Sequence, residues 1–189
     1  MIGMFKGLVA VSLVLMVAAC AGPTADLAKP AVPLGDFRLG HNIAVARSPQ
    51  LVPGSRKATE AEWQKAMTDA IEERFGRYEG SALYHFGISI DAYNLAAIDV
   101  PGIPAPKSAL GVTVTIWDDA KGKKLNPEAK QITVLGVFSG TGIQPTKEVQ
   151  LENLSQLAAK SIQKWLLENP DWFNSNPEAE PIAKAPTDA

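Results

Sequence analysis

The stretch Leu83 to Leu95 reads LYHFGISIDAYNL, and its apolar side chains recur with a period of two. One face carries Tyr84, Phe86, Ile88, Ile90 and Ala92, and the other carries Leu83, His85, Gly87, Ser89, Asp91 and Tyr93. Successive side chains of a strand point to opposite faces of a sheet, so this alternation predicts a strand with one buried face.

The residues before this strand have a helical period. Thr59 followed by Glu62 forms a capping-box pattern, and apolar side chains then recur at helical spacing up to a glycine-containing stop near residues 76–80: Trp63, Met67, Ala70, Ile71 and Phe75. A short apolar run, Asn42 to Ala46 (NIAVA), precedes the helix and is expected to be the first strand.

The residues after the predicted strand Leu83–Leu95 indicate a hairpin and a second helix. In Leu110–Trp117 (LGVTVTIW) apolar and polar residues alternate, which predicts a strand. Asp118–Lys124 (DDAKGKK) has the composition of a turn, and Gln131–Ser139 (QITVLGVFS) is expected to be the returning strand of the hairpin. Thr146–Asn169 has an apolar stripe at helical spacing and ends before Pro170. The order β-α-β-β-β-α predicts an α+β two-layer sandwich, with a mostly antiparallel four-stranded sheet and two amphipathic helices on one face.

Composition limits the function classes. The chain has 189 residues, a net charge of −2 and a pI near 5.7, which argues against nucleic-acid binding through a general basic surface. One cysteine and two histidines exclude a disulfide framework and the usual structural zinc sets. We expect no metal, no cofactor and no nucleic-acid partner.

The N-terminus has the pattern of an export signal. Lys6 precedes an apolar run of 12 residues, Leu8 to Ala19, which is too short for a membrane span of about 20 residues. The run ends in Val17-Ala18-Ala19-Cys20, which contains the only cysteine. This segment resembles the lipobox of bacterial lipoproteins; the alternative is a buried cysteine in an ordinary helix or signal.

The lipobox resemblance covers residues 1–20 only. It implies cleavage before Cys20, diacylglycerol on the cysteine sulfur and a third acyl chain such as palmitate, which together anchor stably. Ala21 implies sorting to the inner leaflet of the outer membrane, facing the periplasm, with the inner membrane left open. The expected organisation is a signal peptide (1–19), an acylated cysteine and flexible tether (20–35), an α+β domain (36–173) and a disordered tail (174–189).

The predicted element order is also similar to that of small envelope lipoproteins with two helices on a four-stranded sheet. Examples are the lipopolysaccharide-assembly lipoprotein of the outer-membrane translocon and the auxiliary lipoproteins of lipid-transporting ABC systems. This is a likeness of architecture, with no shared motif beyond the lipobox, and architecture does not fix function.

The sequence contains little that indicates a catalytic site. Asp91 is six residues from His85 along one strand, roughly 20 Å away, so the two cannot share a metal. Ser139 has no evident histidine partner, and the glycines around Thr141 do not complete a phosphate-binding loop. We therefore expect a protein that is not an enzyme.

Two features suit contact with a protein partner. The loop Val100–Pro106 (VPGIPAP) presents Pro101, Ile103 and Pro104 on a stiff segment that loses little entropy on docking. Trp117 lies on the open sheet face and, with other apolar residues of that face, predicts a patch: Leu83, Tyr93, Leu135 and Val137. The alternatives are a plain crossover loop and a face covered by Trp172 and Phe173.

Three lysines in the hairpin turn, Lys121, Lys123 and Lys124, are candidate contacts for an anionic head group. Asp118 and Asp119 neutralise part of their charge, so a solvated turn is the alternative.

We expect a membrane-anchored, periplasm-facing, non-enzymatic adaptor or assembly factor of an envelope complex. The second hypothesis is a lipid- or lipopolysaccharide-binding module of an envelope transport system.

Overall fold

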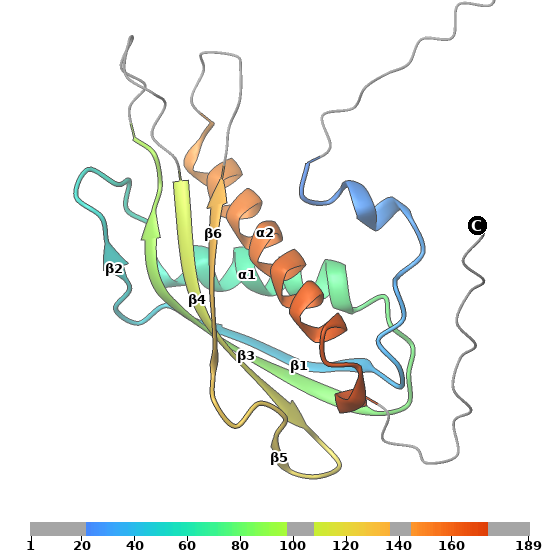
Figure 1. Cartoon of the computed structure of the whole chain (residues 1–189). Helices are drawn as coiled ribbons and strands as arrows, with labels where there is room; N and C mark the ends of the chain where they lie inside the picture. The colour runs from blue at the N-terminus through green and yellow to red at the C-terminus, as the bar shows by residue number, and fades with distance from the viewer. Residues whose placement is uncertain (1–21, 98–107, 137–144, 174–189) are drawn as a thin grey trace, which may run out of the picture.

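The computed structural model describes residues 22–97, 108–136 and 145–173 (Figure 1). A six-stranded sheet packs against two helices, which confirms the α+β two-layer architecture. The strands are β1 (Arg38–Val45), β2 (Gln50–Leu51), β3 (Leu83–Asn94), β4 (Ser108–Asp118), β5 (Lys123–Lys124) and β6 (Lys130–Gly136).

The six strands occupy four rows. Long strands β3 and β4 form the centre, β1 and β2 both pair with β3, and β6 and β5 both pair with β4. The expected four strands thus correspond to four rows whose two outer rows are each made of two pieces. A mostly antiparallel sheet is expected, but the sheet is mixed, because β1 and β2 run parallel to β3. Helix α1 (Glu60–Phe75) provides the crossover that a parallel pair requires.

The helices begin where the sequence indicates. Thr59 Oγ1 accepts from the Glu62 backbone N–H at 3.2 Å, and the Glu62 carboxylate accepts from the Thr59 N–H at 2.7 Å, which completes the capping box of α1. Helix α2 (Lys147–Leu167) starts after Thr146. Among the described residues, neither helix is long and apolar enough to cross a membrane.

A bulge in β3 changes the expected face of one aromatic residue. The register between β3 and β4 shifts between Ile90 and Ala92, so side chains after the shift change sides. Tyr93 is therefore buried rather than on the open face, and its hydroxyl accepts a hydrogen bond from the Ala58 N–H at 3.0 Å. The prediction that Tyr93 belongs to the open-face patch is wrong.

The last described residues pack on the helix side of the sheet. Phe173, in the 3-10 turn η2 (Pro170–Phe173), is fully buried against Phe37 and Tyr84. Trp172 packs edge-on against Trp165, with ring centroids 5.1 Å apart. These aromatic residues therefore extend the core, and they do not cover the open sheet face.

Residues 22–37 lie against the helical layer. The short 3-10 turn η1 (Ala25–Ala28) meets the buried side chain of Arg74, and further along Leu34 and Phe37 are buried. The carbonyl of Leu27 accepts from Arg77 at 3.0 Å. A flexible tether is expected up to residue 35, but residues 22–35 contact the domain surface, because Arg74 of α1 and Arg77, just after α1, donate to their backbone carbonyls.

Candidate partner-binding site on the open sheet face

The open face of the sheet has a groove at the end nearest β5. Cross-strand pairing places His85 opposite Trp117, and Trp117 opposite Lys124. Ile43 of β1 lies opposite Gly87 of β3. The groove measures about 440 Å³ and has small residues on its floor, among them Gly87, Ser89, Thr113 and Thr115. The exposed side chains of Ile43 and Trp117 belong to its apolar lining.

The position of His85 depends on a glycine in the neighbouring strand. The pairing of β1 with β3 is irregular between Leu39 and Asn42, and Gly40 lies within this irregularity. A Cβ atom at Gly40 would lie 2.4 Å from His85 Nδ1, so only glycine leaves room for the ring. The His41 ring stacks on the His85 ring, with centroids 4.9 Å apart.

Hydrogen bonds fix the orientation of the His85 ring. The backbone N–H of His41 donates to His85 Nδ1 at 2.7 Å, so the ring proton is on Nε2. Nε2 lies 2.8 Å from Asp119 Oδ1 and donates to it. Among the described residues, no group of three potential ligands could hold a metal ion. Both ring nitrogens of His85 are thus hydrogen-bonded, which orders this end of the groove.

The partner of His85 is the residue that sequence reasoning missed. Asp91 accepts from the Thr113 hydroxyl instead. Asp119 follows β4 directly, and its backbone N–H donates to the carbonyl of Leu83 at 3.1 Å. The hairpin register brings Asp119 beside His85, and that register could not be read from one strand alone.

The three turn lysines do not converge on one point. Lys124 lies over the indole of Trp117, with Nζ 5.7 Å from the ring centroid. Lys121 forms an ion pair with Asp118 at 2.8 Å, and this carboxylate raises the pKa of Lys121. Lys123 follows the period-two rule onto the face opposite that of Lys124. Only Lys124 thus belongs to the groove.

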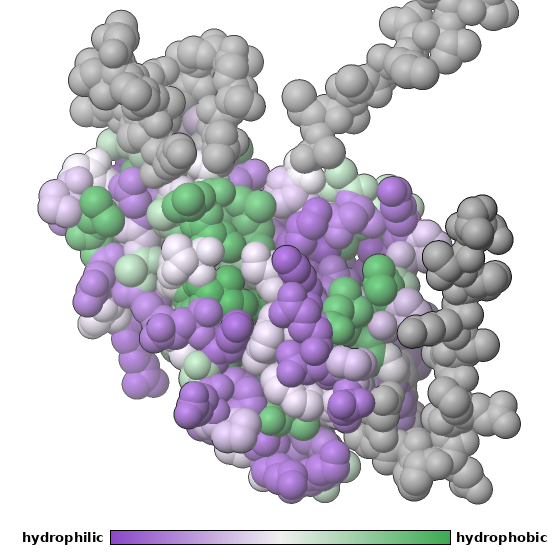
Figure 2. All heavy atoms as spheres, viewed as in Figure 1, coloured by the Kyte–Doolittle hydropathy of each residue, from purple (hydrophilic) through white to green (hydrophobic). Residues whose placement is uncertain are grey.

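The predicted apolar patch is divided. Trp117 is 40% exposed at one end of β4, whereas Leu135, which is 55% exposed, pairs with Ala109 at the other end. Eight residues at about 3.3 Å each separate the two ends by roughly 26 Å. Figure 2 likewise shows hydrophobic residues in separate patches on the face it displays. The groove is therefore a local site, and Leu135 is not part of it.

Several predicted site residues lie outside the described part of the chain. They are the lipidation residue Cys20, the proline-loop residues Pro101, Ile103 and Pro104, and the patch residue Val137. Their roles remain predictions.

No model of a known protein family matches the sequence, and no curated protein matches it. Several solved structures are partly similar, among them the following three. A Xanthomonas campestris protein of the DUF330 family has 14% identity and a TM-score of 0.46, covering 76% of this chain and 90% of that one. A predicted lipoprotein of Caulobacter crescentus has 14% identity, coverages of 73% and 93%, and a TM-score of 0.36. A hypothetical protein of Chlamydia trachomatis has 10% identity, coverages of 75% and 99%, and a TM-score of 0.39.

Proposed function

We propose that this chain is a lipid-anchored, non-enzymatic adaptor or assembly factor of the bacterial cell envelope. In this proposal Cys20 carries the acyl chains, and the domain faces the periplasm from the inner leaflet of the outer membrane. The domain binds an envelope protein through the groove on its open sheet face. The observation that carries the proposal is the exposed pair Ile43 and Trp117 beside a floor of small residues.

The chemistry of the groove indicates what the partner presents. Exposed aromatic residues are enriched among the residues that dominate protein interfaces. A large apolar side chain fits between Ile43 and Trp117, and a neighbouring carboxylate would meet the ammonium of Lys124. We infer a partner segment that carries an apolar side chain next to an acidic one.

The alternative, a lipid or lipopolysaccharide head group at the turn lysines, has less geometric support. A phosphate group gains most from several cations directed at one point. Lys121 is engaged with Asp118, and Lys123 and Lys124 face opposite sides of the sheet. The turn thus supplies one cation to the groove rather than three.

In-cell photo-crosslinking followed by mass spectrometry tests the proposal. Photoreactive residues at Ile43 and at Trp117 should each capture the same envelope protein. A probe at Leu135, exposed on the same face but far from the groove, is the matched control and should not capture it.

A Cys20→Ala chain tests the anchor separately, because its crosslinks should disappear if anchoring brings the partner within reach. Crosslinks only to lipid at Trp117 would favour the head-group hypothesis. Equal capture from Ile43, Trp117 and Leu135 would contradict a local site.

A further inference from the structure

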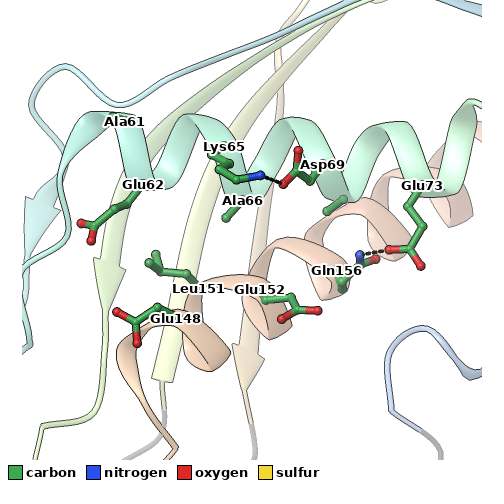
Figure 3. Close-up of a pocket in the computed structure, with 11 residues that line it drawn as sticks. Ala61, Glu62, Lys65, Ala66, Asp69, Glu73, Glu148, Leu151, Glu152 and Gln156 are labelled. Atoms are coloured by element: carbon green, nitrogen blue, oxygen red, sulfur yellow. Dashed lines mark hydrogen bonds and ion pairs between the residues drawn. The ribbon is translucent and has the colours of Figure 1, made fainter.

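The helical layer contains a second groove, on the opposite side of the molecule from the open sheet face. It lies between α1 and α2 and measures about 510 Å³. In Figure 3 the two helices approach each other where Gln156 bonds to Glu73, and they diverge toward Glu62 and Glu148. Its apolar lining includes Ala66, Ala70 and Leu151.

Carboxylates dominate the rim of this helical groove. Five acidic side chains and one lysine line it: Glu62, Asp69, Glu73, Glu148, Glu152 and Lys65. Lys65 pairs with Asp69, and Lys147, just outside the lining, pairs with Glu62. Counting both lysines, five negative charges face two positive ones, so the groove keeps a local excess of negative charge. An occupant with positive charge is favoured electrostatically.

A buried acceptor strengthens the case for a cationic occupant. Gln156 is only 4% exposed, and its amide nitrogen donates to Glu73. Its Oε1 has no hydrogen-bond donor among the described residues. A buried acceptor without a donor is unfavourable, and a rotation of the Gln156 side chain toward the groove that it lines would let a lysine or arginine of the occupant supply the missing donor.

The walls of the groove also select the conformation of the occupant. Both walls are helices, whose backbone groups are already hydrogen-bonded internally. An extended peptide in an apolar groove would leave its own N–H and C=O groups without partners, whereas a helix satisfies its own. Amphipathic helices bind helical grooves through an apolar stripe.

We propose that the α1–α2 groove binds a basic amphipathic helix of a protein partner. The apolar stripe of that helix packs on Ala66 and Leu151, and its lysine or arginine side chains meet Glu148 and Glu152. This second contact surface depends neither on the lipid anchor nor on the open-face groove. With both surfaces, the domain would bring two partners of opposite charge together.

Direct binding tests this inference with a defined probe. The probe is a 15-residue helical peptide with a leucine stripe flanked by lysines, titrated by fluorescence anisotropy into the full chain in phosphatidylcholine nanodiscs, with empty nanodiscs subtracted. The peptide should bind, and added salt should weaken it. A peptide of the same composition with a scrambled stripe, and one with glutamate in place of lysine, should bind at least tenfold more weakly.

Charge-reversal variants locate the site. The double variant Glu148→Lys/Glu152→Lys should weaken the lysine peptide at least tenfold, and Glu152→Gln should weaken it less. Glu168→Lys, at the C-cap of α2 and outside the groove, should change binding less than twofold. Equal weakening by Glu168→Lys, tight binding of the scrambled or glutamate peptide, or no binding of the lysine peptide would overturn the inference. Unchanged unfolding temperatures exclude misfolding, and Trp117→Ala should leave this binding intact.

Discussion

The guanidinium of Arg74, on α1, lies 2.7 Å from the carboxylate of Asp26, in a turn 48 residues earlier in the chain. Arg74 is fully buried and also donates to Gln163 Oε1 of α2 at 2.8 Å and to the carbonyl of Pro23 at 2.9 Å. One side chain thus joins both helices to the segment that follows Cys20.

We predict that Asp26→Asn destabilises the protein by about 1–2 kcal/mol, measured by urea unfolding at pH 7. The substitution removes the negative charge that compensates the buried arginine. Removing one partner of a fully buried ion pair costs about 3–5 kcal/mol of stability. Asp26 is 38% exposed, so water offsets part of the loss. The matched control is Asp69→Asn, because the Lys65–Asp69 pair is well exposed. It should change stability by less than about 0.5 kcal/mol.

The same pair predicts a dependence of stability on pH. The hydrogen bond from Arg74 holds the pKa of Asp26 far below its ordinary value of 3.8 in the folded protein. A carboxyl with a lowered folded pKa contributes stability above its unfolded pKa and loses it as the pH falls. The wild type should therefore exceed Asp26→Asn in stability most at pH 7, and less at pH 3.

A second carboxyl with a lowered pKa, that of Glu62, does not disturb this comparison. Its hydrogen bond from Lys147 lowers the pKa of Glu62 to about 2, so it also contributes to acid destabilisation. Both proteins retain Glu62, and its effect cancels in their difference. A difference in unfolding free energy that is constant from pH 7 to pH 3 would show that Asp26 is not ionically coupled to Arg74.

A buried polar network around Ser108 predicts a large loss of stability when this small side chain is replaced. Ser108 Oγ donates to Gln150 Oε1 at 2.7 Å and accepts from the Ala96 N–H at 3.2 Å, in a fully buried position. Ser108→Ala leaves both groups without this partner and should lower the free energy of unfolding by about 1–3 kcal/mol. Ser89→Ala, on the open face, should change it by less than about 0.5 kcal/mol. Equal effects of the two substitutions would contradict a stabilising network.

Local patterns predicted the elements, while long-range pairing decided the site. The alternation of residues 83–95 and the Thr59 capping box correspond to β3 and α1 almost residue by residue. The β3 bulge that buries Tyr93 and the hairpin register that brings Asp119 to His85 are properties of paired strands. Likewise, the burial of Arg74 depends on its partners Asp26 and Gln163, which lie far from it along the chain.

Two glycines of the open face should respond in opposite ways to alanine. At Gly40 an added Cβ would lie 2.4 Å from His85 Nδ1 and would displace the ring, which breaks its hydrogen bonds to His41 and Asp119. We expect Gly40→Ala to destabilise the protein by about 1–3 kcal/mol in urea unfolding. The His85 ring resonances in the NMR spectrum should shift with it.

Gly87 lies on the groove floor, where the nearest atom to an added Cβ, the carbonyl oxygen of Thr115, is at 3.8 Å. Alanine fits there without strain and restricts the unfolded chain, so Gly87→Ala should leave stability unchanged or raise it by up to about 1 kcal/mol. Its methyl group nevertheless fills part of the groove between Ile43 and Trp117. We therefore predict that Gly87→Ala reduces partner crosslinking from Ile43 while the protein stays fully folded. Undiminished crosslinking in this variant would move the contact surface away from the groove.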